Sequence, residues 1–160
     1  MSGTFNDIDV PPTLCSFAVG MTDVHHTVTP ELKSHGGRLL LLDVKNDDYD
    51  MPDYGDVLSQ YEALRKAIHD GKVLSTYVVG FGGLIEAVSK MAFGNKKGVK
   101  LNGEFKTDSG ALTARNYGNI VIEVESNITA EQMPFRCKEI GSVIDEPAFY
   151  VGDECIGLEE

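Results

Sequence analysis

The stretch VLSTYVVGFGGLIEAVSKMA, residues 73–92, carries the pattern that decides the fold. Its first seven residues are mostly apolar or β-branched, which predicts a buried strand over residues 73–79. The glycines of residues 80–83 predict a tight loop. Apolar residues then recur at helical spacing and predict a helix: Leu84, Ile85, Val88, Met91 and Ala92. The chain is therefore built around a unit of strand, glycine loop and helix.

Other segments extend this unit on both sides. Four consecutive leucines at residues 39–42 predict a second buried strand over residues 38–44; a helix is the alternative, but the run is short. Apolar residues spaced from Val57 to Ile68 predict an amphipathic helix that ends at Gly71. Further strands are expected at residues 13–19, 99–101 and 119–124, a short helix at 109–115 and a hairpin between 138 and 156. The predicted fold class is α+β, layered α/β/α with a mixed sheet.

Composition limits the class of protein. The chain has 160 residues, 42% of them apolar, which is enough for one domain with its own core. Its 14 basic and 25 acidic residues give a net charge of -11, which works against binding nucleic acid or anionic lipid through bulk electrostatics. No apolar run approaches the roughly 20 residues of a membrane helix, and the first residues lack the pattern of a signal peptide. Three scattered cysteines predict free thiols in a reducing compartment.

Gly80, Gly82 and Gly83 are the best candidates for binding a ligand. Glycines between a strand and a helix let backbone N–H groups approach a phosphate, and the start of the helix favours an anion. The segment has neither the Lys-Ser/Thr of a Walker-type loop nor the spacing GxGxxG. A tight turn without a ligand explains the same glycines, so both interpretations stay open.

Two residues outside the loop are further candidates for contacts with a nucleotide, Thr29 and Lys33. Thr29 precedes a proline, so the alternative is that it caps a helix that starts at Pro30. His25 and His26 are expected on a strand and in solvent rather than on a metal. No cysteine or serine stands in a nucleophile motif, so we predict no catalytic residue and no metal site in this chain.

The order of several short segments resembles that of a known superfamily. They are Pro11-Pro-Thr-Leu, Asp23-Val, Val28-Thr-Pro-Glu-Leu-Lys33, the leucine run, Val73-Leu-Ser, Gly82-Gly83-Leu84 and Met91-Ala-Phe-Gly94-Asn. This order is similar to the C-terminal-type domain of the aminoimidazole ribonucleotide synthetase superfamily. Within it, the chain resembles the second such domain of the phosphoribosylformylglycinamidine synthases, over nearly its whole length. Met1-Ser2 resembles the end of the family stretch Gly-Gly-Lys-Asp-Ser-Met-Ser, and residues 146–160 resemble the approach to the glutaminase.

The resemblance implies a fragment of a larger cytoplasmic enzyme. Residues 1–12 would be the end of a linker from a preceding domain, and residues 13–160 one domain. The parent family uses ATP, Mg²⁺ and glutamine to convert formylglycinamide ribonucleotide to its amidine in purine biosynthesis. Its ATP-binding and glutaminase domains would be the partners of this chain, which is expected to be inactive alone. A homodimer of the chain stays open.

The loop departs from the family pattern at the positions that carry chemistry. Many relatives have His-Asp-x-Ser-Asp-Gly-Gly-Leu where residues 77–84 read Tyr-Val-Val-Gly-Phe-Gly-Gly-Leu. Side chains there cannot transfer protons or hold Mg²⁺, so a surviving role would use backbone N–H groups or be structural. The alternatives are another member of the superfamily, of aminoimidazole ribonucleotide synthetase, selenophosphate synthetase or hydrogenase maturation type, or a non-catalytic interaction module.

Overall fold

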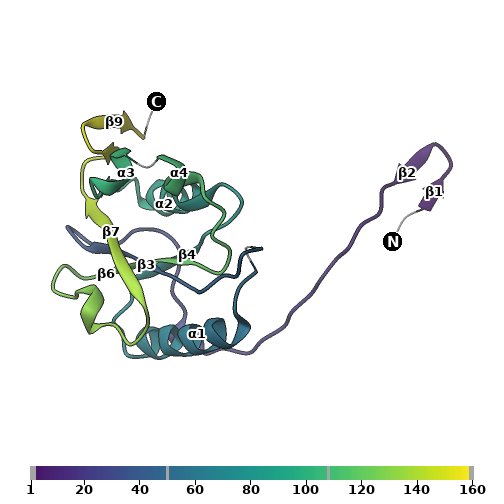
Figure 1. Cartoon of the computed structure of the whole chain (residues 1–160), viewed down its shortest axis with the longest axis horizontal. Coiled ribbons are helices and arrows are strands. Elements are labelled where there is room, and N and C mark those ends of the chain that lie inside the picture. The colour runs from purple at the N-terminus through teal and green to yellow at the C-terminus, as the bar shows by residue number, and fades with distance from the viewer. Residues whose placement is uncertain (1–2, 50, 108, 159–160) are drawn as a thin grey trace.

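The structure, a computed structural model, describes residues 3–49, 51–107 and 109–158. The chain folds into a body with an extended N-terminal segment that runs away from it (Figure 1). A mixed sheet forms the middle of the body. Its strands are, in spatial order, β4 (Ser75–Val78), β6 (Ile120–Val124), β3 (Arg38–Leu42), β7 (Cys137–Ile144), β5 (Gly98–Leu101), β8 (Ala148–Val151) and β9 (Glu154–Gly157). Neighbouring strands are antiparallel except β5 and β8, which are parallel.

Helices cover both faces of the sheet, which confirms the predicted α+β fold with α/β/α layers (Figure 1). The α-helices are α1 (Tyr54–His69), α2 (Gly83–Asn95), α3 (Glu104–Thr107) and α4 (Ser109–Thr113). Two short 3₁₀ helices are η1 (Val24–His26) and η2 (Ala130–Gln132), and strands β1 (Gly3–Phe5) and β2 (Ile8–Val10) form a separate hairpin. In the described part of the chain, no helix combines the length and the apolar character needed to cross a bilayer.

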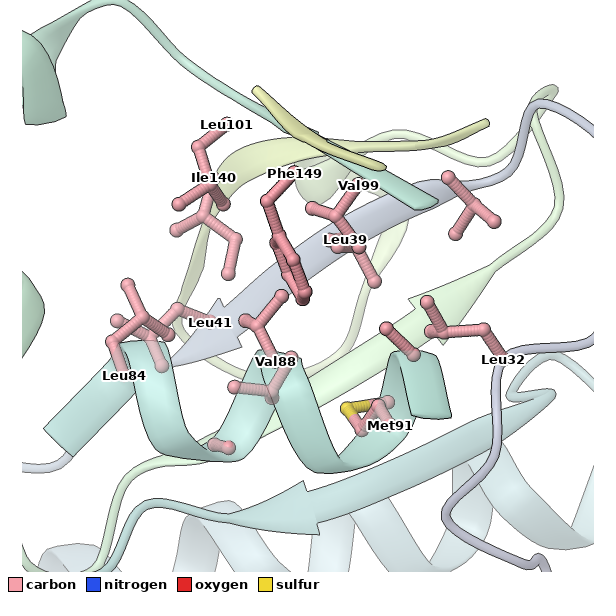
Figure 2. Close-up of a cluster of buried hydrophobic side chains, with 14 of the residues drawn as sticks. Leu32, Leu39, Leu41, Leu84, Val88, Met91, Val99, Leu101, Ile140 and Phe149 are labelled. Atoms are coloured by element: carbon pink, nitrogen blue, oxygen red, sulfur yellow. The ribbon is translucent and has the colours of Figure 1, made fainter. Parts of the chain in front are cut away.

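The leucine run explains why the sheet is buried on both faces. In β3, between β6 and β7, Leu39 and Leu41 join the core under α2, whereas Leu40 and Leu42 join the core under α1. Successive residues of a strand point to opposite faces, so four leucines in a row supply both cores. Figure 2 shows the first core, where Val88 and Met91 of α2 lie against the sheet. The predicted buried strand is confirmed.

The predicted helix ending at Gly71 is also confirmed. Asp53 caps the start of α1, where its carboxylate accepts hydrogen bonds from the N–H groups of Gly55 and Asp56. Gly71 follows the helix with a φ of +70°, a conformation that glycine adopts without a steric penalty. The predicted strands at 73–79, 99–101 and 119–124 correspond to β4, β5 and β6, and the short helix at 109–115 to α4.

Three predictions near the N-terminus are wrong. Residues 13–19 form no strand, because no neighbouring strand of the described chain pairs with them. His25 and His26 lie in η1 rather than on a strand, since the Asp23 side chain caps that turn. No helix begins at Thr29, whose hydroxyl donates to the Glu31 carboxylate at 2.6 Å.

The tail contains more strands than the single hairpin we predicted. β8 and β9 form a hairpin, but β7 pairs with β3 and β5 in the interior of the sheet. The sequence pattern cannot show this, because only the partner of a strand distinguishes an edge from the interior. Met1, Ser2, Glu159 and Glu160, which entered the family resemblance, lie outside the described residues. The domain boundary at residue 12 stays a prediction.

Candidate phosphate-binding loop

The glycine loop lies where β4 ends and α2 begins. The N–H of Gly83 donates to the carbonyl oxygen of Gly80 at 3.1 Å, which closes the turn. Gly83 has a φ of +75°, and a Cβ there would lie 2.6 Å from the carbonyl oxygen of Leu112 and 2.7 Å from the Cα of Thr113. The loop therefore requires glycine at 83 for backbone conformation and for the close approach of α4.

An acidic side chain already contacts the loop. The N–H of Gly82 donates to Oε2 of Glu86, one turn into α2, at 2.7 Å. Oε1 of the same carboxylate accepts a hydrogen bond from Nζ of Lys90 at 2.6 Å. The hydrogen bond from Lys90 lowers the pKa of Glu86 most, and the hydrogen bond from the Gly82 N–H lowers it further. A phosphate bound to the Gly82 N–H would have to displace this carboxylate.

Cations flank the same loop. The guanidinium of Arg115 lies 4.0 Å from the ring centroid of Phe81, a side chain that is 70% exposed. Nζ of Lys90 lies 5.7 Å from the ring centroid of Tyr77. The pKa of Lys90 is raised, mainly by the hydrogen bond to Glu86 and then by Tyr77. An anion that displaced Glu86 would meet the Gly82 N–H and have two cations nearby, Lys90 and Arg115, and among the described residues of the loop no nucleophile lies beside a base.

Thr29 and Lys33 do not join the glycines. Leu32, between them, donates its N–H to the carbonyl oxygen of Met91, near the C-terminal end of α2. Nζ of Lys33 donates at 2.7 Å to the carbonyl oxygen of Leu74, just before β4. The glycine loop lies at the opposite end of both elements, and a 13-residue α-helix is about 20 Å long. One phosphate group cannot contact both sets.

Lys33 instead belongs to a buried polar cluster around Glu123 of β6. This carboxylate, 0% exposed, accepts hydrogen bonds from the N–H groups of Lys33 and Ser34 and from the hydroxyls of Ser34 and Ser75, at 2.6 to 3.0 Å. The cluster fixes the segment before β3 against β4 and β6. These contacts are structural, because the two N–H groups and the two hydroxyls already donate to Glu123.

Sequence reasoning missed Glu86, Lys90, Arg115 and Glu123. The spacing of Glu86 and Lys90 by four residues on a predicted helix is a signal for an ion pair. A glutamate inside the apolar strand Ile120–Val124 signals a buried carboxylate with dedicated donors. Arg115 carried no signal, since only the fold brings it to Phe81. Among the described residues, no group of three or more His, Cys, Asp or Glu could hold a metal ion.

The fold is a layered α/β/α domain with a mixed sheet, and several solved structures share it. Similar solved structures include phosphoribosylformylglycinamidine synthase II from Thermotoga maritima, at 15% identity and a TM-score of 0.68, over 82% of this chain and 27% of that one. Another is PurL from the same organism, complexed with FGAR, at 13% identity and a TM-score of 0.70, over 84% of this chain and 29% of that one.

A third similar structure is the hydrogenase maturation protein HypE from E. coli, at 19% identity and a TM-score of 0.57, over 77% of this chain and 48% of that one. At these identities the similarity shows the fold. This chain spans less than a third of the length of the two T. maritima chains. No protein-family model matches the sequence, and no curated protein matches it.

Proposed function

We propose that this chain is a domain of a phosphoribosylformylglycinamidine synthase, the ATP- and glutamine-dependent ligase that forms formylglycinamidine ribonucleotide in purine biosynthesis. The observation that carries the proposal is the similarity to T. maritima PurL over 84% of this chain and only 29% of that protein, which has been solved with FGAR and, separately, with ADP and ATP. The order of short segments in the sequence supports the same assignment. In this proposal the chain acts in the cytoplasm beside ATP-binding and glutaminase domains of one polypeptide.

The chain itself would hold a phosphate or be structural, and would not turn a nucleotide over. The loop offers backbone N–H donors, whereas Mg²⁺ requires oxygen ligands in octahedral geometry. Mg²⁺ would therefore be held by other domains of the parent.

Tyr77, at the position where many relatives have histidine, is partly buried against the core under α2. We expect Tyr77→Phe to leave the kcat of the parent enzyme within about twofold, since the ring does the packing; a large drop in kcat with unchanged stability would refute this role.

A thermal-shift titration with inorganic phosphate, ADP-Mg²⁺ and ATP-Mg²⁺ tests the loop. A ligand that binds the folded state raises the melting temperature in proportion to the logarithm of its concentration. We expect a rise that continues as the ligand concentration increases and that Gly82→Val abolishes, because the valine side chain would meet Glu86, whose Cβ lies 2.7 Å from a Cβ built at Gly82. Glu86→Gln should strengthen binding, because it removes the competing charge. No shift at millimolar ligand would assign the domain a structural role.

The family assignment needs a separate test. The full polypeptide that contains this chain should form formylglycinamidine ribonucleotide from FGAR, ATP and glutamine, and deletion of this domain should abolish the reaction. The second candidate is hydrogenase maturation, because HypE also shares the fold, although its TM-score of 0.57 is lower than those of the T. maritima structures. A polypeptide that hydrolyses ATP without consuming FGAR would favour that candidate.

A further inference from the structure

The N-terminal segment leaves apolar side chains in solvent. We call residues 11–23 the arm. The exposed fractions of its large apolar side chains are 97% for Leu14, 91% for Phe17, 98% for Val19 and 102% for Met21. Phe17, Val19 and Met21 alternate along the chain, as on one face of a strand. Residues 10–22 carry no charge. Such a segment has the composition of a strand with one buried face, yet it lies away from the body (Figure 1).

The arm is attached to the α1 face of the sheet. At its end, η1 places the His26 ring against the ring of His69 in α1, with centroids 4.0 Å apart and an interplanar angle of 28°. Met21 and Asp23 also line a depression there, beside Tyr61 and Ile68. The end of the arm is thus fixed on the α1 face, whereas Leu14, Phe17 and Val19, which precede it, are exposed to solvent.

An apolar groove lies on the opposite face, between α2 and the β8–β9 hairpin. It has a volume of about 290 Å³ and is lined by Ile85, Phe93, Phe149, Ile156 and Leu158, with Glu154 as its charged residue. Phe149 lines the groove and is also part of the core shown in Figure 2. Phe93 and Ile156 are 59% and 62% exposed. β9 is the last strand of the sheet in the described residues, so its outer edge can accept another strand.

We propose that residues 14–19 of one copy of the chain lie in this groove of a second copy and add a strand beside β9, and that the exchange is reciprocal. The uncharged arm matches the apolar groove, and an extended segment can pair with the edge strand. An arm of the same chain, anchored on the α1 face, would have to turn back around the sheet to reach the α2 face. Reciprocal exchange closes a twofold dimer. This inference goes beyond the proposed function and does not depend on it.

Light scattering after size exclusion tests the dimer. We expect the purified chain to show twice its mass of 17.4 kDa at high micromolar concentration. Phe17→Asp in the arm and Ile156→Asp in the groove should each weaken dimerisation by about 30-fold or more, as for a central apolar contact. Tyr49→Asp is the matched control, because Tyr49 is 86% exposed and lies outside both surfaces. It should leave the dimer intact.

Mixing the two variants distinguishes exchange from other contacts. In a mixture, the unaltered arm of Ile156→Asp can enter the unaltered groove of Phe17→Asp, so a heterodimer should form although each variant alone is monomeric. Circular dichroism checks folding, and a chain lacking residues 1–22 replaces Phe17→Asp if that variant unfolds. A monomeric wild type, a dimer that survives both substitutions, or no heterodimer would overturn the proposal. A monomeric wild type would assign the groove to a neighbouring domain.

Discussion

The Glu123 carboxylate of β6 is a buried polar group whose hydrogen-bond donors come from two other segments of the chain, residues 33–34 and Ser75. We expect Glu123→Ala to lower the free energy of unfolding by about 2–4 kcal/mol, because buried donors of Lys33, Ser34 and Ser75 would lose their acceptor. Urea denaturation measures the loss. Glu125→Ala, at an exposed position just after β6, is the control and should change it by no more than about 0.5 kcal/mol. Equal effects of the two substitutions would contradict a structural role for the cluster.

Asp56, near the start of α1, makes stability depend on pH. Its carboxylate contacts both terminal nitrogens of Arg136, at 2.6 and 3.2 Å, and accepts a hydrogen bond from the N–H of Lys45 at 2.9 Å. These contacts, the Arg136 hydrogen bond first, lower the pKa of Asp56 from 3.8 to about 2. The Asp56 carboxyl group therefore binds its proton more weakly in the folded state than in the unfolded state. The stabilisation is complete above about pH 4 and is lost as the pH falls toward 2.

Asp56→Asn should therefore lower the urea midpoint at pH 7, and the difference from the wild type should shrink below about pH 4. The control is Glu62→Gln on the same helix, where the ion pair with Arg65 is exposed and contributes little. Urea titrations at several pH values measure both. A difference between Asp56→Asn and the wild type that stays constant from pH 7 to pH 3 would exclude the linkage.

At the scale of elements, the junction of β4 and α2 depends on Gly83. Alanine at this position combines a φ of +75° with a Cβ 2.6 Å from the carbonyl oxygen of Leu112. We expect Gly83→Ala to lower the free energy of unfolding by about 2–4 kcal/mol through backbone strain and overpacking. A Cβ at Gly103 would meet nothing within 4 Å, so Gly103→Ala is the matched control. Equal unfolding free energies for both variants, measured by calorimetry, would contradict the requirement for glycine at position 83.

The same junction shows how far sequence patterns reach. The strand and α2 follow from the spacing of apolar residues, because the repeat of a strand and the repeat of a helix are both set by local backbone geometry. The loop follows from its glycines. The contact of Glu86 with the Gly82 N–H depends on one helical turn and could have been anticipated. Arg115 could not, since it is brought to Phe81 by the packing of α4 on α2. Residues 13–19 were predicted as a strand because their composition is that of a strand, but no strand of the described sheet pairs with them.

At the scale of the whole molecule, the body should fold without the arm. The buried apolar core of the described residues begins at Leu32, so deletion of residues 1–22 removes no core side chain. We expect the shortened chain to unfold cooperatively, with a melting temperature within about 2 °C of the wild type at a concentration where both are monomeric. Differential scanning fluorimetry measures it. A large loss of stability in the monomer would show that the arm packs on its own body.

The sequence by itself determined the strand and helix periods, the glycine turn and the α+β class, because these depend on residues a few positions apart. The tertiary structure decided which strands are neighbours, that Lys33 and the glycine loop lie at opposite ends of β4, and that Glu123 joins three segments. Lys33 and Glu123, for example, are 90 positions apart in the sequence. Such contacts form only when burial of both faces of the sheet selects one strand order, and no local pattern encodes that choice.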